Sequence, residues 1–307
     1  MVWGIESARS LGRWVGLGMA VGLSLAAAGN TWSEDPPGPS KVEVIATGLE
    51  APWALAFGPA SDLFVTERAG RIRVIRGGQL LPAPLATLNV AAVGEAGLMG
   101  LAIDPAFGAN RFLYVCYTVR NNGRLVNRVA RLTVRDGKAG AERVLLDEIP
   151  GADQRDGCRL KVGPDGMLYV TTGDAATPEL AQRLDSLAGK ILRLAADGSI
   201  PPDNPFPGSP VYAIGFRNPQ GLAWDRAGLM LAADLVPGPH DEINQIVRGG
   251  NYGWPAASGL ARDPRYRDPM VESGGAIWKP SGIAVHGDTL YVAALLGRQL
   301  VRMRHGP

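Results

Sequence analysis

The motif Arg217-Asn218-Pro-Gln220 combines a guanidinium with two side-chain amides in an otherwise apolar stretch. A guanidinium offers a planar fork of donors that matches carboxylates and carbonyl groups, and amides add further hydrogen bonds. Because an arginine in a tight apolar motif needs an anionic partner, we interpret these residues as a binding site for a ligand that carries carboxylates. The alternative is a structural turn in which Asn-Pro sets the bend.

Short strands must position this motif, and they recur along the chain. Five segments share one pattern of turn, apolar strand, turn and second strand, and they cover residues 53–76, 100–119, 159–175, 221–236 and 282–304. The pattern returns about every sixty residues, and its strands are rich in β-branched and aromatic residues. Repeats of this kind predict an all-β protein with the β-propeller fold, whereas a β-sandwich would not repeat the pattern. Propellers place function on the loops at one mouth of the central channel.

The composition excludes several classes of protein. In 307 residues, 46% are hydrophobic and 20% are charged, which excludes a disordered chain and a coiled coil. The formal net charge of +2 provides no basic field, so we expect no nucleic-acid partner. The two cysteines, Cys116 and Cys158, lack the spacing of a zinc site. They form either one disulfide or two free thiols.

The N-terminus has the layout of a secretory signal. Arg9 and Arg13 precede an apolar run over residues 14–29, which is short for a membrane-spanning helix. We predict a signal peptide over 1–29, a Pro-rich linker over 30–40 and a single propeller domain over 41–307. The protein is then periplasmic or secreted and has no membrane span in its mature chain. An uncleaved membrane anchor is the alternative.

Several motifs in order resemble one family. They cover residues 157–174, 189–205, 215–222, 241–244 and 249–255. This succession closely resembles the soluble PQQ-dependent glucose/sorbosone dehydrogenases, also called aldose sugar dehydrogenases, from about Val42 to Met303. The resemblance implies a six-bladed propeller that holds pyrroloquinoline quinone (PQQ) on a Ca²⁺ ion over its channel. It also implies that the sugar C1 hydroxyl is oxidised to a lactone, with electrons passed to an external acceptor.

The resemblance assigns roles to individual residues. Arg217, Asn218 and Gln220 occupy positions that contact the cofactor in the family. Asp174 occupies the position of the aspartate that orients a catalytic histidine, although a solvated turn residue is the alternative. Arg298 lies in the last repeat, where some members of the family contribute an arginine to the cofactor.

Arg155 is the main departure from the family. It stands where the family has its catalytic histidine, and an arginine cannot accept a proton from the sugar. The chain has three histidines in all, His240, His286 and His305, and none is near position 155 in the sequence. Three alternatives follow. Asp153 or Asp156 acts as the base, although carboxylates beside a cation are poor proton acceptors; His240 reaches the site; or Arg155 pairs with Asp174 and the site is inactive.

Three further positions differ from the family. Val236 and Pro237 align with a Gly-Pro pair whose backbone carbonyls bind Ca²⁺, and valine does not easily adopt the positive φ that glycine allows. Glu95 replaces a glutamine and would repel an anionic cofactor if it faced the site. Cys158 replaces a glycine, and packing is its expected role.

Five repeats are visible rather than six. We expect the segment 42–46 to pair with the last repeat and to cover part of the gap. The favoured function is a PQQ-dependent sugar dehydrogenase. A catalytically impaired or non-catalytic ligand-binding propeller is the alternative, because of Arg155 and the missing repeat. A calcium-dependent hydrolase such as a lactonase is disfavoured by the motifs at 215–222 and 241–244.

Overall fold

Each repeat folds as one antiparallel sheet, because short apolar strands alternate with tight Gly- and Asp-containing turns. The computed structural model describes residues 32–34 and 43–305, which belong to one compact unit. The signal peptide predicted over 1–29 lies outside the described residues. In the described part of the chain, no helix is long and apolar enough to cross a membrane.

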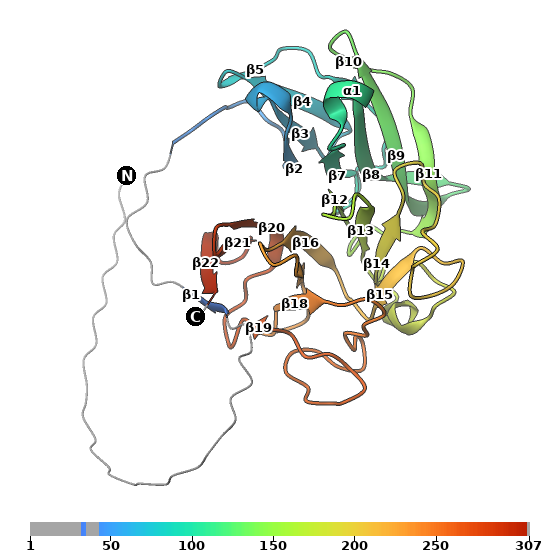
Figure 1. Cartoon of the computed structure of the whole chain (residues 1–307), viewed down its shortest axis with the longest axis vertical. Helices are drawn as coiled ribbons and strands as arrows, with labels where there is room; N and C mark the ends of the chain where they lie inside the picture. Colours follow the sequence, from blue (N-terminus) through green and yellow to red (C-terminus); the bar gives the residue numbers. More distant parts are fainter. Residues whose placement is uncertain (1–31, 35–42, 306–307) are drawn as a thin grey trace, which may run out of the picture. The chain divides into compact units, whose positions relative to one another are not determined.

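The described residues form five sheets (Figure 1). The first contains β2 (Pro52–Phe57), β3 (Leu63–Glu67), β4 (Arg71–Arg76), β5 (Gln79–Leu80) and β6 (Ala86–Thr87). The second contains β7 (Leu98–Ile103), β8 (Phe112–Asn121), β9 (Arg124–Arg135), β10 (Lys138–Ala139) and β11 (Arg143–Pro150). The third contains β12 (Gly157–Val162), β13 (Leu168–Thr172), β14 (Lys190–Leu194) and β15 (Val211–Ile214). The fourth contains β16 (Pro219–Trp224), β17 (Met230–Asp234), β18 (Glu242–Ile246) and β19 (Val271–Glu272). The fifth contains β20 (Pro280–His286), β21 (Thr289–Ala294), β22 (Gln299–His305) and β1 (Trp32–Glu34).

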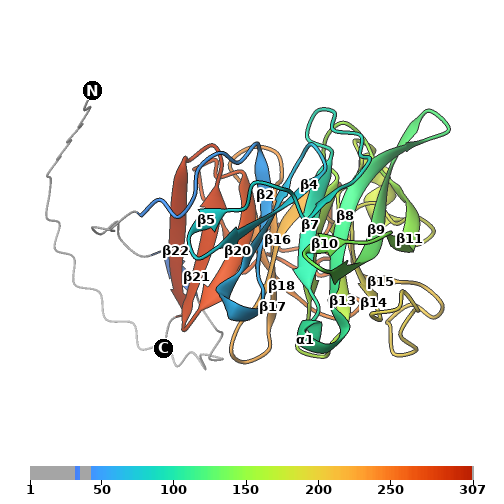
Figure 2. The ribbon, with the colours of Figure 1, turned by 90° about the horizontal axis from the view of Figure 1, so that it is seen from above.

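The first strands of successive sheets lie next to one another, in the order β2, β7, β12, β16 and β20. Four hydrophobic clusters fill the spaces between neighbouring sheets, one for each successive pair. This is the arrangement of a β-propeller, and it confirms the predicted all-β fold with five repeats. The strands run between two loop-rich ends, and the short helix α1 (Phe107–Asn110) lies at one of them (Figure 2). Two 3₁₀ turns, at Pro59–Ser61 and Pro178–Gln182, complete the elements.

The last sheet is completed by a strand from the start of the chain. β1 pairs antiparallel with β22, with Trp32 opposite His305 and Glu34 opposite Met303. From the sequence, residues 30–40 were expected to form a linker and the segment 42–46 to make this pairing. Both expectations differ from the structure, because Trp32–Glu34 forms the strand and residues 43–46 form none.

The two cysteines form a disulfide between neighbouring sheets. Cys116 on β8 and Cys158 on β12 are joined, and both are fully buried. Gly100 on β7 permits this close approach, because an added Cβ would lie 2.2 Å from the carbonyl oxygen of Cys158. Of the two states that the sequence allowed, the structure contains the disulfide.

Candidate functional site

Sheet topology brings the predicted residues to one end of the propeller. In each sheet the inner strand starts at this end and the second strand finishes there, because the two are antiparallel. Arg155 therefore precedes β12, Asp174 follows β13, and Arg217 and Asn218 precede β16. This end is opposite to the one that carries α1, which follows an inner strand.

Backbone bonds fix the turn that carries Arg217. The N–H groups of Arg217 and Asn218 both donate to the Asp234 carboxylate, at 2.9 and 2.7 Å. The Asn218 side-chain oxygen accepts from the N–H of Gly157 at 3.0 Å, which ties β16 to β12. Burial raises the pKa of Asp234 well above its usual value, and the nearby Glu242 adds to this rise. The turn interpretation and the binding interpretation of this motif are therefore compatible, since Asn218 serves the turn.

Asp174 lies at the centre of the site. Its Oδ2 accepts from Trp254 Nε1 at 2.9 Å and from Arg155 Nη1 at 3.2 Å, and its Oδ1 accepts from the N–H of Ala176 at 2.9 Å. The side chain is fully buried. Burial raises the pKa of Asp174, although the bond from Trp254 and the charge of Arg155 oppose this rise. The carboxylate is thus held by donors on three sides and is not a solvated turn residue.

Arg155 is held in place through its backbone. Its N–H donates to Glu95 Oε2 at 3.1 Å, and its carbonyl accepts from the N–H of Ala175 at 3.1 Å. Gly173 is required here, because an added Cβ would lie 1.8 Å from the Arg155 carbonyl oxygen. Arg155 itself has a φ of 62°, a left-handed conformation that costs a non-glycine residue about 1 kcal/mol. The guanidinium is thereby placed on Asp174, and its Nε has no partner.

Arg217 lies close enough to the same carboxylate for the two charges to affect each other. Its Nη1 donates to the Leu235 carbonyl at 3.0 Å, and its guanidinium lies 5.6 Å from the centre of the Trp254 ring. Burial and the positive charge of Arg155 lower the pKa of Arg217. Its Nε is buried without a partner. Arg155 and Arg217 thus bring two guanidinium groups to the site, and such groups suit a ligand with carboxylates, although Glu95 and Asp234 also act on Arg217 with negative charge.

The other predicted residues are less closely associated with this cluster. The Gln220 side chain makes no hydrogen bond to a described residue, and its backbone carbonyl accepts from Arg159 Nε at 2.6 Å. Arg298 lies in the exposed turn between β21 and β22, and no hydrogen bond or ion pair joins it to Asp174 or Arg217. Glu95 contacts the backbone of Arg155, so its charge lies beside the site.

The loop after β17 holds the two residues expected to bind calcium. Val236 is buried, and its N–H donates to the Asp241 carboxylate. Its φ is not in the left-handed region, so valine is accommodated without strain. Pro237 is exposed. Among the described residues, no three side chains of the Asp, Glu, His or Cys type are grouped to hold a metal, so a bound cation would depend on backbone carbonyl groups.

Two of the alternative bases lie away from the cluster. Asp156 was expected to be a poor proton acceptor beside Arg155, but burial raises its pKa to about 6. Its Oδ1 accepts from Asn127 Nδ2 at 2.7 Å and from the N–H of Ala152 at 3.0 Å, not from Arg155. His240 lies 3.6 Å from Glu272 and is half-exposed. Of the three alternatives, the structure contains the Arg155–Asp174 ion pair.

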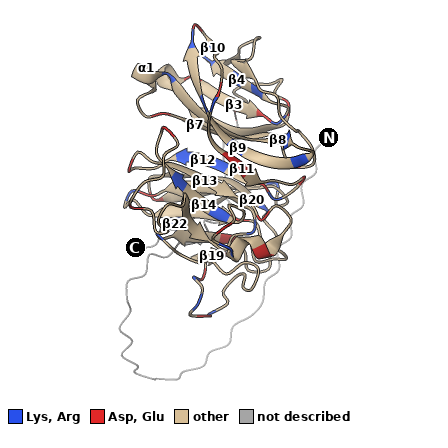
Figure 3. Ribbon diagram, turned by 90° about the vertical axis from the view of Figure 1, so that its right-hand side faces the viewer, with Lys and Arg blue, Asp and Glu red and all other residues tan. Residues whose placement is uncertain are grey.

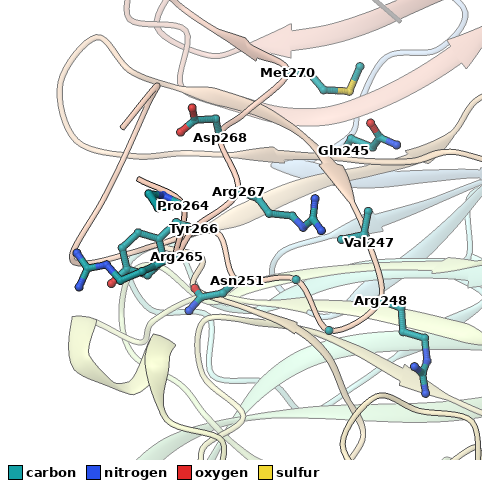
Figure 4. A pocket seen from close by; sticks show the side chains of 12 residues that line it. Gln245, Val247, Arg248, Asn251, Pro264, Arg265, Tyr266, Arg267, Asp268 and Met270 are labelled. Carbon is teal, nitrogen blue, oxygen red and sulfur yellow. The ribbon is translucent and has the colours of Figure 1, made fainter. Parts of the chain in front are cut away.

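Trp254 is a site residue to which no role was assigned from the sequence. It belongs to the motif at 249–255, and its preceding loop is held by Gln182, whose Nε2 donates to the Trp254 carbonyl at 2.7 Å. A separate pocket of about 630 Å³ borders the start of this motif (Figure 4). Arg248, Asn251 and Arg267 contribute to its lining, and none of the predicted site residues does.

Comparison with known proteins identifies the family. The family model for glucose/sorbosone dehydrogenases matches residues 49–302. The chain belongs to the glucose/sorbosone dehydrogenase family. Quinoprotein glucose dehydrogenase B of Acinetobacter calcoaceticus is 35% identical, over 73% of this chain and 54% of its own length. An aldose sugar dehydrogenase of Escherichia coli K12 is 34% identical, over 72% of this chain and 63% of its own length. The chain thus matches less than two thirds of these two relatives.

Solved structures of the glucose/sorbosone dehydrogenase type share the fold. A candidate oxidoreductase (glucose dehydrogenase) from Thermus thermophilus is 45% identical, with a TM-score of 0.81 over 85% of this chain and 81% of that one. The PQQ-bound aldose sugar dehydrogenase of Streptomyces coelicolor is 35% identical, also with a TM-score of 0.81, over 90% of this chain and 82% of that one. The expected family is confirmed.

Proposed function

We propose that this protein is an exported sugar oxidoreductase that binds PQQ at the cluster of Arg155, Asp174 and Arg217. The observation that carries the proposal is the pair of guanidinium groups, Arg155 and Arg217, near one buried carboxylate, which places two positive charges at this end of the propeller. A planar ligand with several carboxylates matches this charge and the geometry of guanidinium donors. The PQQ-bound structure of the Streptomyces coelicolor relative supports the choice of ligand.

Arg217 and Gln220 would hold the cofactor. Arg217 has a second terminal nitrogen with no bond to a described residue, and the Gln220 amide is likewise unpaired. The carbonyl groups of Val236 and Pro237 would hold Ca²⁺. PQQ, when bound, supplies the acceptor for the electrons and hydrogen taken from the sugar C1. The protein contributes charge, orientation and a proton acceptor.

The site lacks a group that is well suited to accept the proton of the sugar hydroxyl. Asp174 is the carboxylate that pairs with Arg155 at this site, and burial favours its taking up a proton. However, Arg155 donates to the same Oδ2 and stabilises the ionised form, and Arg155 itself accepts no proton. This ion pair favours a second candidate function, a propeller that binds the cofactor or another anion with little or no turnover.

The test separates binding from turnover. The purified protein is titrated with PQQ, with and without Ca²⁺, and sugar oxidation is then measured with an artificial electron acceptor. We expect micromolar, Ca²⁺-dependent binding that Arg217→Gln weakens at least tenfold, since a charge-assisted hydrogen bond contributes about 1.5–3 kcal/mol. An absence of binding by the unmodified protein would reject the proposal.

Arg155→His tests the proton acceptor. An imidazole at this position can accept a bond from the sugar hydroxyl while Asp174 orients its other nitrogen, as general-base catalysis requires. We expect at least a hundredfold gain in kcat, with activity that rises between about pH 5.5 and 7.5 as the imidazole loses its proton. The matched control is Arg298→His at an exposed turn, which should produce no gain. If the unmodified protein binds PQQ but turns over no sugar, and Arg155→His restores turnover, the second candidate function is the correct one for the natural chain.

A further inference from the structure

A second group of cations lies deeper in the propeller, on the inner strand β12. Arg159 and Lys161 are two residues apart on this strand, so their side chains leave the same face. At about 3.3 Å per residue, they lie roughly 7 and 13 Å along the strand from Gly157, at which the proposed PQQ site begins. Figure 3 shows the blue of basic residues on β12, within the body of the molecule.

The guanidinium of Arg159 reaches the middle of the propeller. It stacks on the Trp53 ring of β2 at 3.9 Å, and its Nε donates to the Gln220 carbonyl of β16 at 2.6 Å. An added Cβ at Gly282 of β20 would lie 3.5 Å from its Nη2. Arg159 thus contacts or approaches three inner strands besides its own, and only 7% of the residue is exposed.

Neither cation has a negatively charged partner. No carboxylate of the described residues forms an ion pair with Arg159 or Lys161, and neither Nη atom of Arg159 has a hydrogen bond to them. Burial alone lowers the pKa of Arg159 to about 9. Burial and the positive charge of Arg159 lower the pKa of Lys161.

Among the described residues, Lys190 and Arg193 are also buried cations, and both are satisfied. Lys190 donates to the carbonyls of Leu180, Ala181 and Ala188 at 2.8, 2.9 and 2.6 Å. Arg193 forms ion pairs with Asp165 and Asp203. A buried cation without such partners is costly, so the contrast with Arg159, beside which Lys161 is partly buried, points to a partner that comes from solution.

We propose that the centre of the propeller binds a small oxyanion between Arg159 and Lys161, in a site separate from the one proposed for PQQ. The two free Nη atoms of Arg159 form a fork that matches the spacing of two oxygens in a phosphate, sulfate or carboxylate group. Lys161, two residues further along the strand, supplies a second positive charge that is close enough to affect that of Arg159. The Trp53 ring closes one side and fixes the plane of the fork.

The test measures anion binding to the full-length mature protein in a buffer of low ionic strength. Inorganic phosphate, sulfate and acetate are titrated by calorimetry, with chloride at matched ionic strength as the reference. We expect saturable binding of one oxyanion per chain, and the three titrations distinguish an inorganic from a carboxylate ligand. Binding no stronger than that of chloride for all three oxyanions would overturn the proposal.

Variants locate the site. Lys161→Met keeps the length of the side chain and removes its charge, and we expect it to weaken oxyanion binding at least tenfold. Lys138→Met, at an exposed residue of β10, is the matched control and should leave the affinity unchanged. Arg159→Gln should abolish oxyanion binding. If this variant does not fold, the oxyanion affinity of Lys161→Met alone tests the proposed site.

Arg217→Gln separates the two proposed sites. It should leave phosphate affinity unchanged while it weakens PQQ binding. Phosphate affinity that falls with Arg217→Gln and is insensitive to Lys161→Met would show that the anion occupies the upper site, and would overturn the inference without affecting the proposed function.

Discussion

Asp156 is a buried carboxyl group whose charge opposes folding. Its pKa is raised to about 6 by burial, and its Oδ2 has no hydrogen-bond partner. The carboxyl group of Asp156 therefore binds a proton more tightly in the native state than in the unfolded chain, so its neutral form favours folding. Stability from this group is present below the unfolded pKa, near 3.8, and is lost as the pH rises through 6. At pH 7 the ionised group costs about 2–3 kcal/mol.

Asp156→Asn removes this dependence on pH. We expect the unfolding free energy of the variant, relative to that of the natural protein, to be about 2 kcal/mol higher at pH 7 than at pH 4, measured by urea denaturation at both pH values. Asp153→Asn, at an exposed neighbour, is the matched control and should change stability by less than about 0.5 kcal/mol at either pH. Equal pH profiles for Asp156→Asn and the natural protein would contradict the buried position of this carboxylate.

The sequence predicts the members of the site better than their environments. Asp174 and Arg217 follow from motifs that end or begin strands, so topology alone brings them to one end. The pKa of Asp156 could not be predicted from the sequence, because a neighbouring cation lowers a carboxyl pKa whereas burial raises it. Only the packed structure shows that Asp156 faces Asn127 rather than Arg155. Trp254 was missed because its contact with Asp174 joins residues 80 positions apart.

At the scale of elements, the disulfide joins β8 to β12 and so holds the second sheet to the third. It closes a loop between residues 42 positions apart, for which the chain-entropy model gives about 4 kcal/mol of stabilisation. We expect the double variant Cys116→Ala/Cys158→Ala to lose about 2–4 kcal/mol of unfolding free energy in urea. The natural protein under reducing conditions should lose a similar amount. A natural protein whose unfolding midpoint is insensitive to reductant would show that the bridge is absent in solution.

The individual strands were predictable where the local pattern was strong. The five repeats indicated the inner strands and their partners, because β-branched runs bounded by Gly and Asp leave few alternatives. The region 178–194, which lies between two strands of the third repeat, contains the 3₁₀ turn Pro178–Gln182 and then β14. The pairing of β1 with β22 was not predictable in register, because it joins two segments from opposite ends of the chain.

At the scale of the whole molecule, one face of β2 carries apolar side chains that no described residue covers. Leu55 and Phe57 are 60% and 76% exposed, whereas Phe64 on the neighbouring strand β3 is 5% exposed. Exposed apolar groups of this size promote association between molecules. We expect Leu55→Thr/Phe57→Thr to reduce self-association in sedimentation velocity while unfolding free energy changes by less than about 1 kcal/mol, since threonine suits an exposed strand. Phe64→Ala, the buried control, should instead cost about 3–5 kcal/mol. A comparable loss in the double threonine variant would show that Leu55 and Phe57 are covered in the folded protein.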